Sequence, residues 1–282
     1  MWNFGYHLAR AKGTAIRRSY LRRLKRIVRQ KVDPRASLEL DVFSYSGEAA
    51  LPEQVASIRS FLKHAGRPRS FNVVSDGTYS HESESLLREL DPSVCVHSSP
   101  PPPPSNLPTS FQNYLHEHPT GRQLALIMSL PHERPALYVD SDVLFFAGAK
   151  CIEEIIRPQS SAALYLQDCQ FSGDERLLLN HAEQQDPINT GVALFHGQLD
   201  WSVAVRRFEK LEDAAPTFFT NQTLTHLALH ANGAVALDPR KFVLQLDDQF
   251  IYSDRYAGPE IALRHYVNPV RHKFWTSLAR AS

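Results

Sequence analysis

The chain has 282 residues, 43% of them hydrophobic and 22% charged, which is typical of a globular protein with one large α/β domain or two small ones. Its three cysteines, Cys95, Cys151 and Cys169, show no paired spacing, which argues against a disulfide framework and fits a reducing, cytoplasmic setting. No apolar run approaches the roughly 18 to 20 residues that span a bilayer, and residues 1–13 lack the apolar region of a signal peptide.

The charge is distributed unevenly along the chain. Residues 1–35 contain eleven of the 31 bases and one of the 30 acids, so residues 36–282 carry 20 bases and 29 acids, a net charge of −9. We therefore expect a basic N-terminal appendage over residues 1–35 and a separate acidic domain over residues 36–282. An acidic body repels phosphate, which argues against nucleic-acid binding.

The N-terminal appendage has the pattern of a basic amphipathic helix that ends before Pro34. Apolar residues recur at helical spacing and cations fill the positions between them. The apolar positions are Ile16, Tyr20, Leu21, Leu24, Ile27 and Val28. Such a helix can make peripheral contact with an anionic membrane through residues 10–31, each cation near the surface contributing about 1 kcal/mol. It can equally pack on the acidic body or remain a solvated tail.

From residue 38 onward, strand and helix patterns alternate. The sequence predicts strands at 38–45, 70–75 and 94–97, with helices at 53–64 and 82–90 between them. This alternation is typical of a parallel sheet covered by helices, in which ligands bind at the carboxyl ends of the strands. Five consecutive prolines at 100–104 predict a stiff, extended connector, and a helix is expected at about 121–130.

Two carboxylates stand at the end of a buried-strand pattern. The apolar run 136–139 leads into Asp140, Ser141 and Asp142, and the apolar run 143–146 follows at once. Alternation in an extended chain points Asp140 and Asp142 the same way, so both can face one cation. Because two like charges beside apolar residues need compensation, a hard divalent ion with diphosphate oxygens in its shell is the natural partner. A pair of solvated turn carboxylates is the simpler alternative.

The run from Leu137 to Leu144 resembles the DxD strand of GT-A glycosyltransferases, especially glycosyltransferase family 8, the glycogenin and bacterial galactosyltransferase type. The resemblance implies an α/β GT-A fold, with a mixed, mainly parallel central sheet flanked by helices, over residues 36–282. It implies a transferase that moves a sugar from a nucleotide-diphosphate donor, a UDP-sugar, to an unknown glycan, lipid or protein acceptor with retention. Asp140 and Asp142 would bind Mn²⁺ or Mg²⁺ at the donor diphosphate, with Ser141 facing the donor.

Further stretches are similar to motifs that follow the DxD strand in the family. These are residues 187–195, 219–224, 237–240 and 264–275. By this resemblance Asn189, Thr190 and Gly191 line the donor-sugar pocket, and His265 is the third protein ligand of the metal. Gln222 lies beside the reacting sugar carbon as the catalytic residue, and Lys273 contacts the diphosphate. Asn221 stands where the family has an acid.

Other donor contacts are expected from the fold. The nucleotide base should lie over the ends of the first two strands, near Ser44, Tyr45 and Asp76. Arg122, at the start of the helix before the DxD strand, is either a diphosphate contact or a solvated helix-end cation. If the enzyme instead inverts, a carboxylate base is needed. Its candidates are Asp168, Asp186, Asp247 and Asp248.

Two other functions remain open from the sequence. A haloacid dehalogenase-type phosphotransferase also carries DxD after an apolar strand, and Asp247 with Asp248 would supply its later acidic pair. A non-catalytic protein of the same fold would bind a nucleotide sugar without transferring it.

Overall fold

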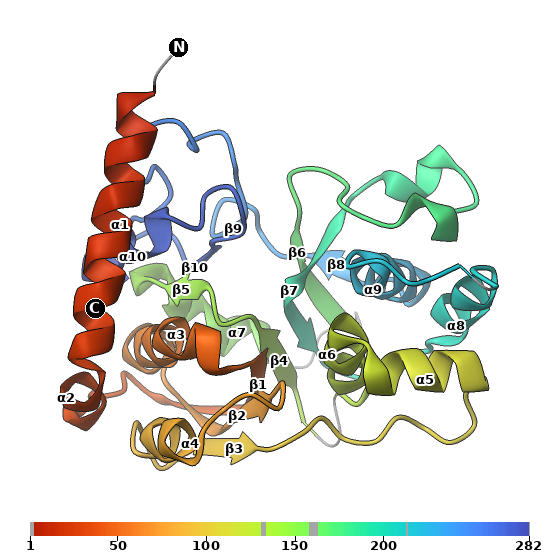
Figure 1. The fold of residues 1–282 in the computed structure, drawn as a ribbon, viewed down its shortest axis with the longest axis horizontal. Coiled ribbons are helices and arrows are strands. Elements are labelled where there is room, and N and C mark those ends of the chain that lie inside the picture. The colour runs from red at the N-terminus through yellow and green to blue at the C-terminus, as the bar shows by residue number, and fades with distance from the viewer. Residues whose placement is uncertain (1–2, 131–133, 158–162, 213, 282) are drawn as a thin grey trace.

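The computed structural model describes residues 3–130, 134–157, 163–212 and 214–281, which form two sheets with helices around them (Figure 1). The larger sheet has the strand order β3-β2-β1-β4-β7-β6-β8, and the smaller one β5-β10-β9. The strands are β1 (Ser37–Ser46), β2 (Arg67–Ser75), β3 (Val94–His97), β4 (Ala136–Val139), β5 (Val143–Phe145), β6 (Ala163–Gln167), β7 (Ile188–Phe195), β8 (Val235–Ala236), β9 (Phe242–Val243) and β10 (Leu263–His265). The helices are α1 (Phe4–Arg22), α2 (Leu24–Arg29), α3 (Leu51–His64), α4 (His81–Arg88), α5 (Thr109–Glu117), α6 (Pro119–Met128), α7 (Ile152–Ile155), α8 (Ser202–Glu209), α9 (Thr220–Ala231) and α10 (Lys273–Ala281).

The larger sheet is mixed, with one reversed strand. β1 pairs in parallel with β2 and β4, and β2 pairs in parallel with β3. β7 runs antiparallel to both β4 and β6, and β6 pairs in parallel with β8. The prediction of a mixed, mainly parallel sheet flanked by helices is confirmed. Because β7 is reversed, its first residues lie at the same edge as the last residues of β4.

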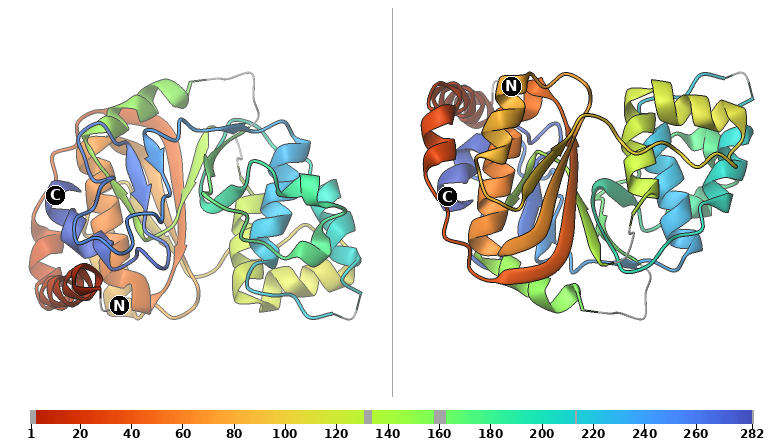
Figure 2. Two further views of the ribbon diagram at one scale, coloured as in Figure 1. Left: turned by 90° about the horizontal axis from the view of Figure 1, so that it is seen from above. Right: turned by 90° about the horizontal axis from the view of Figure 1, so that it is seen from below.

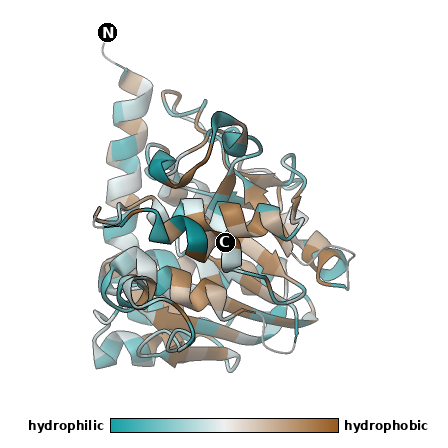
Figure 3. Cartoon of the chain, turned by 90° about the vertical axis from the view of Figure 1, so that its right-hand side faces the viewer, coloured by the Kyte–Doolittle hydropathy of each residue, from teal (hydrophilic) through white to brown (hydrophobic). Residues whose placement is uncertain are grey.

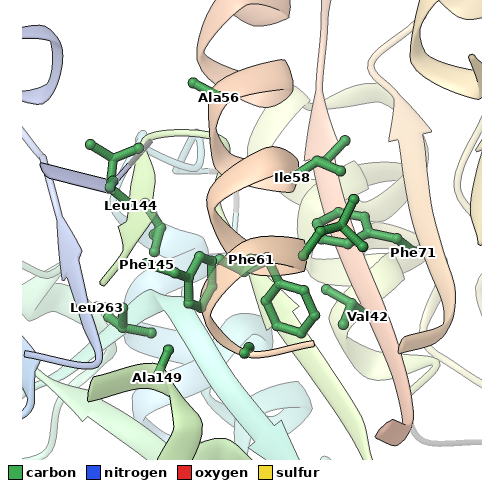
Figure 4. Close-up of a cluster of buried hydrophobic side chains, with 14 of the residues drawn as sticks. Val42, Ala56, Ile58, Phe61, Phe71, Leu144, Phe145, Ala149 and Leu263 are labelled. Carbon is green, nitrogen blue, oxygen red and sulfur yellow. The ribbon is translucent and has the colours of Figure 1, made fainter. Parts of the chain in front are cut away.

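Each strand sends alternate side chains into two separate cores. Along β4, Leu137 and Val139 join the core under α3, whereas Tyr138 joins the core under α6 and α9. The views from above and below separate these two groups of helices (Figure 2). In the first core, Phe61 of α3 packs edge-on against Phe71 and Phe145, with ring centroids 5.7 and 5.0 Å apart (Figure 4). Burying one such side chain contributes about 1.5–3 kcal/mol, so α3 fixes the larger and smaller sheets against each other.

The N-terminal helices pack on the body through their apolar face. Tyr20, Leu24 and Val28 are buried in the same core as α3, and the rings of Tyr20 and Trp275 lie 5.0 Å apart. Arg17 forms an ion pair with Glu53 of α3. Of the alternatives for the apolar stripe, packing on the body is therefore the one that this structure displays.

The opposite face of these helices carries the cations. Figure 3 shows α1 at one edge of the molecule, rising beyond the sheets. Its exposed residues include Leu21, 48% exposed, and Phe4, 79% exposed. From residue 18 to the end of α2, the exposed cations are Arg18, Arg22, Arg23, Lys25, Arg26 and Arg29. Membrane contact through residues 10–31 stays a prediction. Among the described residues, no helix combines the length and apolar character needed to cross a bilayer.

The elements predicted from the sequence are present, with shifted ends. The strands predicted at 94–97 and 136–139 match β3 and β4 to the residue, and the helix predicted at 121–130 is α6, which begins two residues earlier. The proline run forms an irregular connection from β3 to α5 that crosses between the two groups of helices (Figure 2). The predicted connector is therefore present, and its stiffness stays a prediction.

Candidate metal centre and donor cavity

Three potential metal ligands converge at the end of β4. Asp140, Asp142 and His265 each offer one ligand atom, and these three atoms lie within 4.8 Å of one another. His265 Nε2 lies 3.0 Å from Asp142 Oδ1 and 3.6 Å from Asp140 Oδ2. The two carboxylates thus face one point, as predicted, but the reason differs: β4 ends at Val139, and a turn at Ser141 and Asp142, rather than strand alternation, brings them together.

Strand pairing explains why a residue 123 positions away meets Asp142. β10 runs antiparallel to β5 with His265 opposite Val143, the residue after Asp142. The next amide, Tyr266 N–H, donates to the backbone oxygen of Asp142 at 3.0 Å. The register of this small sheet therefore sets the third ligand beside the first two.

The other side of β10 is fixed by a buried charge cluster. Arg264 is fully buried and its guanidinium donates to both carboxylate oxygens of Asp248, at 2.7 and 2.9 Å, and to Asp254. Because neighbouring side chains of a strand point to opposite faces, anchoring Arg264 on one face directs His265 to the metal centre on the other.

The three ligands have linked protonation states. Burial is the main cause that raises the pKa of Asp140; the charge of His265 lowers this pKa, the neighbouring Asp142 raises it, and the net direction is upward. Burial also acts to raise the pKa of Asp142, but the charge and hydrogen bond of His265, together with the charge of Arg271, bring the net pKa below its ordinary value. For His265, burial lowers the pKa, yet the two carboxylates raise it to a net value above the ordinary one. A positive charge is thus favoured at this point between the carboxylates.

A hydrogen-bond chain holds Asp140 in place from the other core. Tyr138 Oη–H donates to Asp140 Oδ1 at 2.8 Å, and Gln123 Nε2 donates to the same oxygen at 3.1 Å. Asn221 Nδ2 in turn donates to Gln123 Oε1 at 2.9 Å. Asn221, at the position where the resembled family has an acid, therefore supports the DxD motif through Gln123.

A cavity of about 590 Å³ opens over these ligands, within the usual range for small-molecule sites. It is lined by eight of the predicted site residues: Tyr45, Asp140, Ser141, Asp142, Asn189, Thr190, Gln222 and His265. Asn189 Oδ1 lies 2.9 Å from His265 Nδ1, so it orients the imidazole. Asp168 Oδ2 accepts from Asn189 Nδ2 at 3.1 Å and from Gln222 Nε2 at 3.4 Å. Asp168 alone among the four candidate bases lines this cavity.

Gly191 acts beneath the cavity surface. A Cβ at this position would lie 2.1 Å from His265 Cε1, so only glycine leaves room for the imidazole. Its carbonyl accepts from Asp140 N–H at 2.8 Å, which joins β7 to the end of β4.

Besides Gly191, four predicted donor contacts lie outside the cavity lining. Ser44 is fully buried and donates to Gln54 at 2.8 Å, and Asp76 accepts from Thr78 in a local turn. Arg122 donates to backbone carbonyls of His116 and Asp76. Their hydrogen bonds serve to shape the neighbouring strands and helices.

Lys273 is the fourth of these residues. It is fully buried, and its ammonium donates to the carbonyls of Ile251 and Ser253 and lies 3.3 Å from Asp248. The cation that does reach the cavity is Arg271, whose Nη2 lies 3.0 Å from Asp142 Oδ2. Sequence reasoning missed Arg271, although it lies only two residues from the predicted cation.

Asp247 and Asp248, the acidic pair that the phosphotransferase alternative requires, form ion pairs away from Asp140. Asp248 is buried against Arg264 and Lys273, and Asp247 pairs with Arg255. Neither lines the cavity that contains Asp140. The structure therefore does not support the haloacid dehalogenase interpretation.

Comparison with known proteins identifies the fold. No protein-family model and no curated protein sequence matches the chain. Among solved structures, it is similar to the galactosyltransferase LgtC, solved with donor and acceptor sugar analogues, with a TM-score of 0.51 and 13% identity over 85% of this chain and 95% of that one. Mouse xyloside xylosyltransferase 1 gives a TM-score of 0.51 and 11% identity over 83% of this chain and 99% of that one.

A third similar structure is the bifunctional glycosyltransferase WbbM, with a TM-score of 0.52 and 12% identity over 89% of this chain. The present chain spans only about half, 51%, of that longer protein. The strand order, the DxD position and these three similarities agree. The chain has the GT-A fold of nucleotide-sugar transferases.

Proposed function

We propose that this protein is a metal-dependent glycosyltransferase that moves a sugar from a nucleotide-diphosphate donor to an acceptor. The observation that carries the proposal is the convergence of Asp140, Asp142 and His265 in a cavity that also presents Asn189 and Gln222. Carboxylates and an imidazole suit a divalent cation, and amide side chains suit the hydroxyl groups of a sugar.

The residues at the centre fit a divalent metal such as Mn²⁺ or Mg²⁺. Two carboxylate oxygens and one imidazole nitrogen form a hard to borderline donor set. His265 and Arg271 both direct positive charge at Asp142, as a cation bound there would do. When bound, such an ion supplies Lewis-acid stabilisation of the charge that develops on the leaving diphosphate.

Side chains of the cavity would stabilise the leaving group and position the sugar. Arg271, half exposed at the cavity wall, would move from Asp142 to the diphosphate and stabilise the leaving group there. Gln222, held by Asp168, would lie beside the reacting sugar carbon in a retaining transfer. UDP is the nucleotide that the family resemblance favours.

The acceptor would enter past the start of α9. Phe218 and Phe219 line the cavity and are 73% and 45% exposed. Exposed aromatic rings at the mouth of a polar cavity offer flat apolar surfaces to a ligand that is partly outside it. We assign this side of the cavity to the acceptor.

A thermal-shift panel tests the proposal. The melting temperature is measured with UDP, GDP, ADP and CDP, each with and without Mn²⁺, because a ligand of the native state raises it. We expect a metal-dependent rise with at least one nucleotide, and no rise in Asp142→Ala. An equal rise in that variant would count against the site.

Donor hydrolysis and product analysis then separate an enzyme from a non-catalytic binder. We expect release of nucleoside diphosphate from the matching sugar donor and a product that keeps the donor's anomeric configuration. Binding without hydrolysis or transfer would favour the binder. An inverted product would instead make Asp168 the base.

A further inference from the structure

A second hollow lies beside the metal cavity, between α1 and the segment that follows His265. Its volume is about 700 Å³, and it is lined by Arg10, Gly13 and Thr14 of α1 and by the residues that follow β1. The latter are Ala49, Ala50 and Glu53. The hollow is therefore formed jointly by the N-terminal helix, the start of α3 and the segment that follows β10.

The two hollows share part of their wall. Asn268 and Arg271 line both of them. Arg271 contacts Asp142 on one side, so a diphosphate held at the metal centre would have the second hollow within reach on the other. A ligand that extends from a diphosphate in both directions would fit one half into each hollow.

The chemistry of each hollow indicates which half it takes. The metal cavity presents Asn189 and Gln222, which suit a sugar. The second hollow lies at the start of α3, the helix that follows β1, and in open α/β sheets nucleotides bind outside the carboxyl ends of the strands. We propose, on the basis of the proposed function, that the second hollow holds the nucleoside of the donor and that α1 forms one wall of the nucleotide site.

The packing of α1 is firm enough for this role. A Cβ at Gly13 would lie 2.3 Å from the backbone oxygen of His272, so the helix touches the segment that carries Arg271. Tyr6 packs edge-on against His272 with ring centroids 5.1 Å apart. The wall is therefore held by direct contact with the same segment that bounds the metal cavity.

Arg10 places a positive charge at the second hollow. It is exposed, and within the described part of the chain no carboxylate forms an ion pair with it, whereas Arg17 nearby is paired with Glu53. An exposed cation next to a diphosphate site strengthens binding of the anionic ligand and speeds its entry. Glu53, already satisfied by Arg17 and by the indole of Trp275, adds little repulsion.

Two variants on α1 test the assignment in the full-length protein. Thr14→Trp places a large side chain in the hollow, and Arg10→Glu reverses its charge. Arg18→Trp and Arg18→Glu are the matched controls, because Arg18 is exposed on the same helix and lines neither hollow. Dissociation constants are measured by calorimetry with Mn²⁺ present, for pyrophosphate and for the tightest-binding of UDP, GDP, ADP and CDP.

We expect Thr14→Trp and Arg10→Glu to weaken nucleoside-diphosphate binding about tenfold or more, equivalent to about 1.4 kcal/mol, with both controls within about twofold. Thr14→Trp should leave pyrophosphate binding unchanged, since pyrophosphate has no nucleoside. Equal loss of pyrophosphate binding at an unchanged melting temperature would overturn the nucleoside assignment.

The experiment separates this inference from the proposed function. If the unmodified protein binds none of the four diphosphates with Mn²⁺, the proposed function fails and the inference fails with it. If the unmodified protein binds one and Thr14→Trp binds it equally well, only the inference fails.

Discussion

The guanidinium of Arg271 lies 3.0 Å from a carboxylate oxygen of Asp142 at the wall of the cavity. Two residues later, Lys273 points into the interior and contacts Asp248. Arg271 therefore faces the cavity, whereas Lys273 faces the core.

Substituting each cation tests this difference. Arg271→Met should weaken binding of a nucleoside diphosphate with Mn²⁺ by about tenfold or more, with little change in melting temperature because the side chain is half exposed. Lys273→Met should lower the free energy of unfolding by about 2 kcal/mol or more, because it removes a buried partner of Asp248. Calorimetry and chemical denaturation measure the two effects. A Lys273→Met protein that is stable but fails to bind would restore Lys273 as the diphosphate contact.

The space around the imidazole gives a second prediction. Gly191→Ala forces a methyl group to within 2.1 Å of His265 Cε1, so His265 must move away from Asp142. We expect Mn²⁺ affinity, followed by electron paramagnetic resonance, to fall about tenfold, with about 1–3 kcal/mol lost from stability through overpacking. Gly197→Ala, just after the same strand, is the control because nothing lies within 4 Å of its Cβ. Equal Mn²⁺ affinity in the two variants would show that His265 is not a ligand.

An acid at position 221, as in the family that the sequence resembles, should not improve metal binding. In Asn221→Asp the new carboxylate cannot donate to Gln123 Oε1, so Gln123 must turn its amide and lose its hydrogen bond to Asp140. We expect weaker Mn²⁺ binding and slower donor hydrolysis, by roughly threefold to tenfold, for the loss of about one hydrogen bond. Faster hydrolysis in Asn221→Asp would contradict this role of Asn221.

The start of α9 provides a pH-dependent element of stability. Asp174 accepts hydrogen bonds from Arg176 and Thr220, and the bond from Arg176 is the main reason that the pKa of Asp174 is lowered. A depressed folded-state pKa stabilises the protein above the unfolded value of about 3.9 and loses that contribution as pH falls through the folded value. Urea denaturation between pH 7 and pH 3 should therefore show a shallower loss of stability below about pH 4 in Asp174→Asn. Parallel curves for the two proteins would argue against this contribution.

Membrane contact is best tested by charge reversal on the outer face of α1 and α2. Deleting the helices would remove Tyr20, Leu24 and Val28 from the core and confound the result. Replacing Arg18, Arg22 and Arg26 with glutamate should abolish pelleting with phosphatidylserine vesicles, because each cation contributes about 1 kcal/mol at an anionic surface.

Vesicles of phosphatidylcholine alone are the control, and neither protein should pellet with them. Equal pelleting of the triple variant and the unmodified protein with phosphatidylserine would rule out this membrane surface.

The local parts of the site were predictable because they depend on local pattern. An apolar run predicts the strand β4, and the two carboxylates that follow do face one point, although a turn after the strand rather than strand alternation aligns them. The family resemblance supplied His265, whose position depends on strand pairing that no local pattern reveals.

The sequence did not predict the direction in which some of the candidate side chains point. The rule that ligands bind at strand ends selects an edge of the sheet, and Tyr45 does line the cavity while its neighbour Ser44 faces the core. The choice between Lys273 and Arg271 depends on how the segment after β10 turns. Likewise, the apolar stripe of α1 indicates that one face is covered, but not that the body of the protein covers it.

The pairing of β10 with β5 also affects when the candidate metal centre can assemble. A chain is synthesised from its N-terminus, so His265 leaves the ribosome last among the three ligands. Until then the nascent chain has only the two aspartates, with no strand to direct an imidazole toward them. The three potential ligands can therefore come together only after β10 has been synthesised and has paired with β5.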